Sequence, residues 1–388
     1  MTQIRNLDKL AQRIIKAIQK GERMVLYADS DLDGTAALII LKEAILRLGG
    51  APPVIFFSDR RTEEPGLIRS NLERFQNQAP ALLVLIDCGI SNFAEVKLAK
   101  KMGFEVALLE HHEILNKLPE AALIVDPKQE KKKTPSFDLA AVGLSFKLAE
   151  RLLRDHFPRE LRESFLELAA LATISDMVPQ TGENQPIIDE GLPLLETSLR
   201  PAIRVLFASS LVRNCQSTRE IVQKVIPIIN VTEKEGDLGE LYLFLSASAQ
   251  EAKERLDKFF QRGSDRQREI DKWLGFFQGQ LFLQKEKIIF VGHADLPSAV
   301  LGAITSRLCN FFEKPTFLFK RTAKEDIGHF RTPVGLSGIK ALGSCKNLLR
   351  RYGGHAMAGG FYFNSKDEES LKKCLTEFFN DKRSGLKS

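Results

Sequence analysis

The sequence predicts an α/β protein: a domain built on a parallel sheet, then a smaller α/β domain, joined by a long helical connector. Three observations support this fold class. Short apolar runs alternate with helical patterns over residues 22–126, and strands that are apolar throughout are typical of parallel sheets covered on both faces. A second alternation starts at residue 287, after a long charged helical stretch. The length of 388 residues also suggests two or three domains.

The elements of the first half follow in chain order. An amphipathic N-terminal helix has apolar residues at helical spacing and ends at Gly21. Continuous apolar runs predict strands at residues 24–27, 54–57, 82–86 and 106–109. Amphipathic patterns predict helices between them, at 35–48, 65–76 and 92–102. Helices then dominate, at 138–154, 160–174 and 186–199.

The second half begins with residues 217–284, which we interpret as a long connecting helix. We assign its aromatic stripe to packing rather than to base stacking. Strands are then expected at 288–291, 316–319, 328–331 and 361–363, and helices at 298–312, 339–352 and 368–379. The predicted domains are therefore residues 1–205, a connector at 206–284, and residues 285–388.

The composition is that of an ordinary soluble protein and identifies no partner. Hydrophobic residues make up 44% and charged residues 27%, and the net charge of +6 is too small to require or exclude nucleic acid. The five cysteines are scattered without a Cys-x-x-Cys pair, so we expect neither a disulfide framework nor a zinc knuckle. This cysteine usage suits a protein of the reducing cytoplasm, where we expect the chain to be located. No apolar run approaches the ~18 residues that span a bilayer, so we expect no membrane association.

Four clusters of acidic residues and histidines follow apolar segments, and three of these segments are predicted strands. The clusters are Asp29, Asp31 and Asp33; Asp87; Glu110, His111 and His112; and Asp176. Ligands of parallel sheets bind at the carboxyl ends of the strands. We therefore expect these side chains to share one site.

Each cluster alone has a simpler interpretation. Asp33, which precedes Gly-Thr, can cap a helix, and Asp-x-Asp-x-Asp-Gly resembles a calcium loop, although Glu43 fits the last ligand position poorly. Crowded carboxylates, however, repel one another unless cations hold them. Carboxylates with imidazoles and no thiolate favour Mn²⁺ or Mg²⁺ over structural zinc. Two such ions can act on both the attacking and the leaving oxygen of a phosphoester, so the sequence predicts two divalent cations and phosphoester hydrolysis.

The four clusters resemble the four motifs of the DHH phosphoesterase superfamily, and in particular its RecJ exonuclease branch. Residues 142–149 and 166–192 are also similar to RecJ, and residues 353–360, Gly-Gly-His-Ala-Met-Ala-Gly-Gly, resemble the signature of the DHH-associated domain, DHHA1. The resemblance implies a two-metal phosphodiesterase that hydrolyses single-stranded DNA from its 5′ end. Repair or replication proteins are its candidate partners.

The resemblance also implies roles for individual residues. The implied metal ligands are Asp29, Asp31, Asp33, Asp87, His111 and Asp176, with Asp87 as the bridge. The implied catalytic residues are Asp87, His111, His112 and Asp176, and His112 is expected to contact the scissile phosphate. The implied substrate contacts are His112, Ser306, Arg307, Arg331, Gly353, Gly354 and His355. For the two arginines, a surface ion pair is the alternative.

The chain departs from the family pattern in four places. Glu110 stands where the family has an Asp that is expected to orient an imidazole. Residues 229–234 lack an arginine that is thought to engage the terminal phosphate of the substrate. A Trp-His pair of the family is replaced around residues 292–295. Too few residues follow Phe363 for the OB-fold of full-length RecJ. Two alternatives therefore stay open: a phosphodiesterase of short oligonucleotides (nanoRNase-like) or of a signalling dinucleotide, and a non-catalytic replication or repair scaffold.

Overall fold

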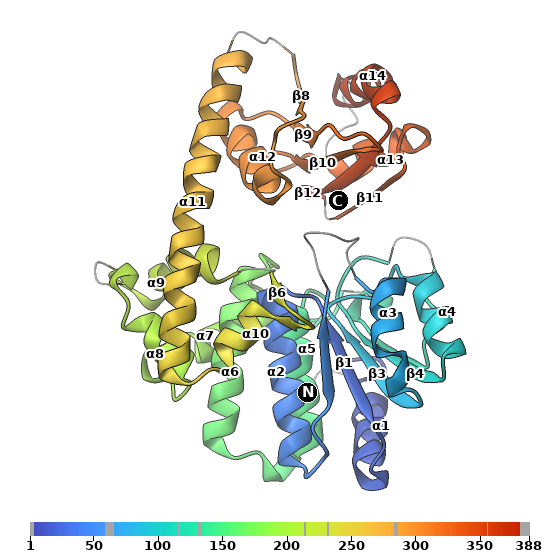
Figure 1. Cartoon of the computed structure of the whole chain (residues 1–388), viewed down its shortest axis with the longest axis vertical. Helices are drawn as coiled ribbons and strands as arrows, with labels where there is room; N and C mark the ends of the chain where they lie inside the picture. The colour runs from blue at the N-terminus through green and yellow to red at the C-terminus, as the bar shows by residue number, and fades with distance from the viewer. Residues whose placement is uncertain are drawn as a thin grey trace. The chain divides into compact units, whose positions relative to one another are not determined.

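The computed structural model describes residues 4–58, 66–114, 117–130, 133–212, 215–230, 233–282, 286–354 and 356–380. The chain divides into two compact units, Met1–Gln261 and Arg262–Ser388 (Figure 1). The predicted connector, residues 206–284, is thus shared between the two units. Among the described residues, no helix is both long enough and apolar enough to cross a membrane.

The first unit is built on a five-stranded sheet in the order β2-β1-β3-β4-β5, with every neighbouring pair parallel. The strands are β1 Met24–Ala28, β2 Val54–Phe57, β3 Ala81–Ile86, β4 Phe104–Leu109 and β5 Leu123–Val125. The first four confirm the predicted strands and their parallel order. The edge strand β5 was not predicted, because three residues are too short a run to show a pattern.

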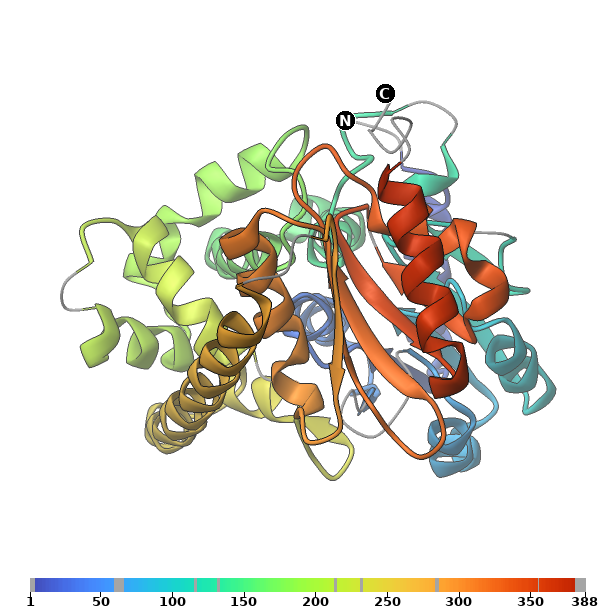
Figure 2. The ribbon, with the colours of Figure 1, turned by 90° about the horizontal axis from the view of Figure 1, so that it is seen from above.

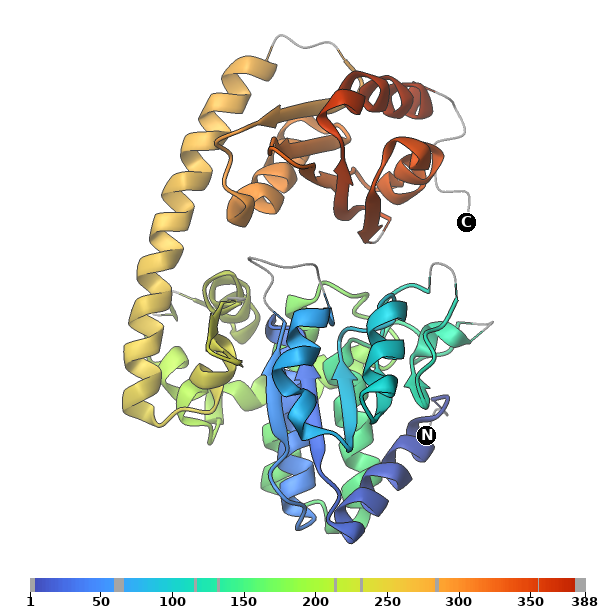
Figure 3. The same cartoon turned by 45° about the vertical axis from the view of Figure 1, so that its right-hand side comes forward.

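Helices cover both faces of this sheet (Figure 3). The helices of this part of the chain are α1 Leu7–Lys20, α2 Leu32–Arg47, α3 Arg69–Phe75, α4 Phe93–Lys101, α5 Ala141–Leu153, α6 Arg159–Ser175, α7 Asn184–Gly191 and α8 Pro201–Phe207. Alternate residues of β1 point to opposite faces: Leu26 packs in the core formed with α1, α2 and α5, and Tyr27 in the core formed with α3 and α4. Both cores are apolar, which explains why the strands are apolar throughout.

The stretch predicted as one long helix is in fact divided. It contains α9 Thr218–Ile229, the strands β6 Lys234–Glu235 and β7 Leu238–Gly239, α10 Glu240–Leu245 and α11 Ala249–Leu281. The strands β6 and β7 form an antiparallel hairpin whose turn contains Gly236 at φ 65°, a left-handed conformation that glycine adopts at low cost. The prediction for the aromatic stripe is confirmed for Trp273 and Phe277, which are buried.

The second unit has a mixed sheet in the order β11-β12-β10-β9-β8, in which only β8 and β9 are parallel. Its elements are β8 Ile289–His293, α12 Ser298–Phe312, β9 Thr316–Lys320, β10 Asp326–Arg331, α13 Gly338–Ser344, β11 Arg351–Gly354, β12 Ala358–Phe363 and α14 Glu368–Asn380. Helices α13 and α14 pack on one face and α12 on the other (Figure 2). The helix predicted at 339–352 is wrong at its end, where residues 351–354 pair with β12 instead.

One disulfide joins Cys345, the C-cap of α13, to Cys374 of α14, a pairing that the scattered cysteines did not predict. The two residues are 29 positions apart in the sequence, but packing of the two helices brings their Cα atoms to 6.1 Å, within the reach of a disulfide. Sequence spacing carries no signal of this contact. Cys88, Cys215 and Cys309 form no disulfide with the cysteines that the structure describes.

Candidate metal centre

The four predicted clusters meet at the carboxyl edge of the parallel sheet. Asp29 follows β1, Asp87 follows β3, Glu110 follows β4, and Asp176 caps the end of α6. Because β1, β3 and β4 are adjacent and parallel, their carboxyl ends lie at the same edge. The predicted convergence of these segments is therefore what the fold contains.

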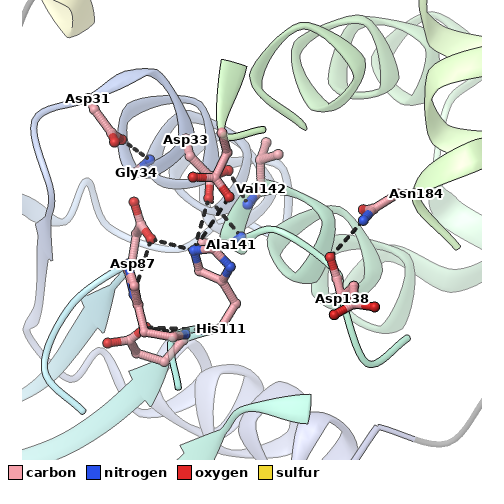
Figure 4. Close-up of polar contacts among 12 residues, drawn as sticks. Asp31, Asp33, Gly34, Asp87, His111, Asp138, Ala141, Val142 and Asn184 are labelled. Atoms are coloured by element: carbon pink, nitrogen blue, oxygen red, sulfur yellow. Dashed lines mark hydrogen bonds and ion pairs between the residues drawn. The ribbon is translucent and has the colours of Figure 1, made fainter. Parts of the chain in front are cut away.

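The first segment places three carboxylates around the start of α2. The buried Asp29 accepts hydrogen bonds from the backbone N–H of Ser30 and from the hydroxyl of Ser58, both at 2.7 Å. Asp31 is the N-cap of α2 and accepts from the N–H of Gly34 at 3.1 Å (Figure 4). A Cβ at Gly34 would lie 2.5 Å from the backbone oxygen of Asp29. The tight loop that gathers these carboxylates therefore requires glycine at this position.

Asp33 is joined to a helix that begins more than 100 residues later. Its two carboxylate oxygens accept from the N–H groups of Ala141 and Val142, each at 2.8 Å, at the start of α5 (Figure 4). The N-terminal amides of a helix have no partners within the helix and favour negative charge. The interpretation of Asp33 as the cap of the helix that follows it is wrong, because Asp31 is the N-cap of α2. Asp33 lies inside α2, binds the first amides of α5 and is part of the cluster.

His111 lies at the centre of the cluster and faces three carboxylates. Its Nε2 is 3.1 Å from an oxygen of Asp87 and 3.7 Å from oxygens of both Asp33 and Asp176 (Figure 4). Asp87 has a left-handed backbone, φ 59°, and its N–H donates to the oxygen of Leu109 on β4. The hydrogen bond across to β4 holds this unusual conformation, which brings Asp87 against His111.

Glu110 orients the second imidazole. One of its oxygens accepts from the backbone N–H groups of His111 and His112 and from Nδ1 of His112 at 2.8 Å, and the other accepts from the N–H of Ile90. Burial by itself raises the pKa of Glu110, but the imidazole of His112 lowers it to about 2. Loss of water around its ring lowers the pKa of His112, and the Glu110 carboxylate raises it to about 9. Glu110 therefore contacts the His112 ring in the way that is expected of the family Asp, and its role stays a prediction.

The electrostatics of the cluster favour a cation. Burial, followed by the neighbouring carboxylates, raises the pKa of both Asp33 and Asp87 well above its ordinary value. Three groups of side chains each bring one ligand atom per residue within 4.8 Å of the others: Asp87, His111 and His112; Asp33, His111 and Asp176; and Asp29, Asp31 and Asp87. Oxygen and imidazole donors in this number suit hard divalent cations. The residues present fit two ions.

The cluster is not sealed from water on all sides. Asp29, Asp33, Asp87 and His111 are each less than 5% exposed, whereas the side chain of Asp176 is 19% and that of His112 41% exposed. His112, Asp176 and Asp31 are therefore its partly exposed members. This agrees with a buried ligand set beside a residue that contacts substrate.

The substrate residues predicted in the second unit have different surroundings. Arg307 pairs with Asp271 at 3.1 Å, so its contacts are those of the surface-ion-pair alternative. Ser306 precedes it on α12. Arg331, on β10, donates to its neighbour's backbone oxygen and pairs with no carboxylate that the structure describes, and burial lowers its pKa. All three substrate roles stay predictions.

The glycine-rich segment is a strand pair. Gly353 and Gly354 lie on β11 opposite Gly360 and Gly359 of β12, and a Cβ at Gly359 would lie 2.1 Å from the oxygen of Gly353. The glycines thus allow the two backbones to approach closely. The predicted substrate residue His355 lies outside the described residues.

Sequence reasoning missed three polar residues beside the cluster, two of which contact its segments. Ser58 binds Asp29, as described above. Asp126, at the end of β5, is fully buried, and burial raises its pKa to about 7. Asn230 contacts the start of α2 and the end of α6. Ser58 and Asp126 both directly follow strands at the carboxyl edge of the sheet. This position could have identified Ser58, because β2 was predicted, but not Asp126, because β5 was not.

Residues 23–173 match the sequence model of the DHH family, N-terminal domain. The single-stranded-DNA-specific exonuclease RecJ of Bacillus subtilis is 29% identical over 381 residues, covering 97% of this chain and 48% of that protein. RecJ of Thermus thermophilus is 28% identical over 361 residues, covering 92% of this chain and 52% of that protein. The chain therefore spans about half the length of these curated relatives.

Solved structures agree with this similarity. The exonuclease RecJ bound to manganese superposes with a TM-score of 0.80 at 25% identity, covering 99% of this chain and 96% of that one. RecJ of Thermus thermophilus in complex with Mn²⁺ superposes with a TM-score of 0.84 at 24% identity, covering 99% of this chain and 56% of that one. The second match shows the fold alone.

Proposed function

We propose that this chain, whose residues 23–173 are a DHH-family domain, is a two-metal phosphodiesterase that hydrolyses single-stranded DNA from the 5′ end. The observation that carries the proposal is the convergence of four sequence segments on three overlapping groups of metal-ligand atoms. The relatives named above, exonucleases specific for single-stranded DNA, support the choice of substrate.

Six side chains would hold two Mn²⁺ or Mg²⁺ ions: Asp29, Asp31, Asp33, Asp87, His111 and Asp176. Ions bound there would lower the pKa of water and stabilise negative charge on the phosphate. Asp87 belongs to two of the ligand groups, which supports its role as the bridge. Asp33 holds its position through the amides at the start of α5, so its geometry does not depend on the ions.

His112 is the residue that would contact the scissile phosphate. Glu110 accepts from Nδ1 of His112 and thereby fixes the plane of the imidazole ring. The His112 side chain is partly exposed, which makes it accessible to substrate. Arg331 would contact a further phosphate, since the described residues offer it no carboxylate partner. Ser306, Arg307, Gly353, Gly354 and His355 remain proposed contacts of the strand.

The test is nucleotide release from end-labelled single-stranded DNA in the presence of Mn²⁺. We expect mononucleotides from a 5′-labelled strand, and loss of release in Asp87→Ala. A variant of the exposed Asp155, Asp155→Ala, serves as the control for loss of one carboxylate and should retain full activity. Release that is absent in the unsubstituted chain, or unaffected by Asp87→Ala, contradicts the proposal.

A second candidate function is hydrolysis of short oligonucleotides, and one contact favours it. Lys234, the last residue of the segment that lacks the family arginine, donates from Nζ to the backbone oxygen of Phe57 at 2.9 Å. Its charge is thus engaged within the first unit. A length series of labelled DNA and RNA separates the two candidates, since equal or faster turnover of long DNA rejects the short-substrate function. Absence of Mn²⁺ binding would instead indicate a non-catalytic scaffold.

A further inference from the structure

We propose that Asn230 is a positioning residue that holds two metal-binding segments of the first unit in register. The inference rests on the proposed function, because it concerns the same ligand cluster. Asn230 follows the last turn of α9, and its side chain contacts two segments far from it in sequence. Each of these segments carries proposed ligands.

The first contact is to the start of α2. The side-chain oxygen of Asn230 accepts from the backbone N–H of Leu32 at 2.9 Å, and Leu32 lies between the ligands Asp31 and Asp33. The first amides of a helix have no partner within the helix. Asn230 thus satisfies the Leu32 amide from outside, while the carboxylate of Asp31 caps Gly34.

The second contact is to the end of α6. The side-chain nitrogen of Asn230 donates to the hydroxyl of Ser175 at 3.2 Å, and Ser175 directly precedes the ligand Asp176. The orientation of the amide is determined by chemistry, because the Leu32 N–H can only donate and must face the oxygen. A single planar group therefore sets the spacing between the two segments.

Asn230 is itself fixed by the hydrophobic core. Val222, Val225 and Ile229 of α9 are fully buried, so the end of this helix has a defined position. The chain that follows reaches the same edge of the sheet again: Phe57 donates its N–H to the oxygen of Asp237, and the next residue, Ser58, binds Asp29. Asn230 and Asp237 thus both contact segments that carry or support ligands.

The test compares Mn²⁺ affinity, measured by isothermal titration calorimetry, in three variants of the full chain. Asn230→Ala removes both contacts, and we expect a ten- to hundredfold weaker affinity, the loss typical of residues that orient metal ligands. Ser175→Ala removes one contact, and we expect about a threefold or greater loss. Asn6→Ala is the matched control, since Asn6 also joins distant segments, through Ile124, but none that carries a ligand. We expect unchanged affinity there.

The outcomes separate this inference from the proposed function. If the unsubstituted chain binds Mn²⁺ and Asn230→Ala binds it within twofold of the same affinity, the positioning role is overturned and the proposed function stands. If the unsubstituted chain binds no Mn²⁺, both are overturned. Should Asn230→Ala be unfolded by circular dichroism, Ser175→Ala decides on the same criterion, and Asn230→Gln, which restores the amide group, should recover part of the affinity.

Discussion

Replacement of Asp87 by Asn should make the metal-free protein more stable while removing its response to Mn²⁺. Burial raises the pKa of Asp87 most, and the carboxylates of Asp33, Asp31, Asp29 and Asp176 raise it further. The amide keeps an oxygen for the contact with His111 at 3.1 Å but carries no charge. The substitution therefore removes repulsion without removing a side-chain contact.

The size of the effect follows from the spacing of the ligand atoms. Two unit charges at the 4.8 Å limit of these groups repel by about 3 kcal/mol at an effective dielectric constant of about 20. Proton uptake by the crowded carboxylates relieves part of this repulsion. We therefore expect Asp87→Asn to raise the free energy of unfolding by about 1–3 kcal/mol in EDTA.

The assay is urea unfolding followed by circular dichroism, with EDTA and with Mn²⁺. Ion binding at 100 times the dissociation constant should add about 2.7 kcal/mol to the unsubstituted chain, and much less to Asp87→Asn. Asp155→Asn, on the surface of the same unit, should change neither measurement by more than about 0.5 kcal/mol. The reasoning is refuted if Asp87→Asn is less stable in EDTA, or if it retains the full stabilisation by Mn²⁺.

Three further predictions concern Glu110, Glu167 and the disulfide. Glu110→Gln should lower the proposed nuclease turnover ten- to hundredfold, because an amide has one oxygen and cannot accept from the groups that bind both oxygens of Glu110. Glu110→Asp, which introduces the family residue, should retain more activity. Equal turnover in all three proteins would contradict the orienting role. Burial raises the pKa of Glu167 to about 7, so the folded state binds the proton more tightly than the unfolded state. The free energy of unfolding should therefore fall by up to about 3 kcal/mol as the pH rises from about 4.5 to about 7. Denaturant unfolding at pH 5 and pH 8 should show a smaller fall in Glu167→Gln, and an equal fall in both proteins would contradict the prediction. Cys345→Ser opens the 29-residue loop closed by the disulfide with Cys374 and should lower the free energy of unfolding by about 3–4 kcal/mol on a chain-entropy basis. The melting temperature should fall, and a reductant should no longer change it. The prediction fails if the variant has the same melting temperature as the unsubstituted, oxidised protein.

The first unit could be predicted in outline because its strands are buried on both faces. Continuous apolar runs such as 82–86 identify the strands, and the polar residue after each run must then lie at the carboxyl edge of the sheet. The proximity of Asp87 and His111 follows from this rule. The long helices were predicted for a similar reason, since the periodicity of each is contained in its own residues.

Short elements escaped prediction because their stability comes from neighbours. The strand β5 has three residues, too few for a pattern, and β11, Arg351–Gly354, has no apolar run. They form by pairing with β4 and β12. The hairpin between α9 and α10 escaped for the same reason. In each case the hydrogen bonds that stabilise the element lie on another strand, so the local sequence does not contain the information.

By itself, the sequence determined which side chains form the cluster and which cations suit it, because ligand chemistry is a property of residue type and strand ends share an edge. Only the tertiary structure decided what holds these side chains in place. The amides of α5 that bind Asp33 lie over 100 residues from it, and Asn230 is 198 residues from Leu32. The partner of Cys345 was likewise decided by the packing of α13 on α14. Such contacts depend on where separate elements pack, and packing is set by the whole core rather than by any one segment.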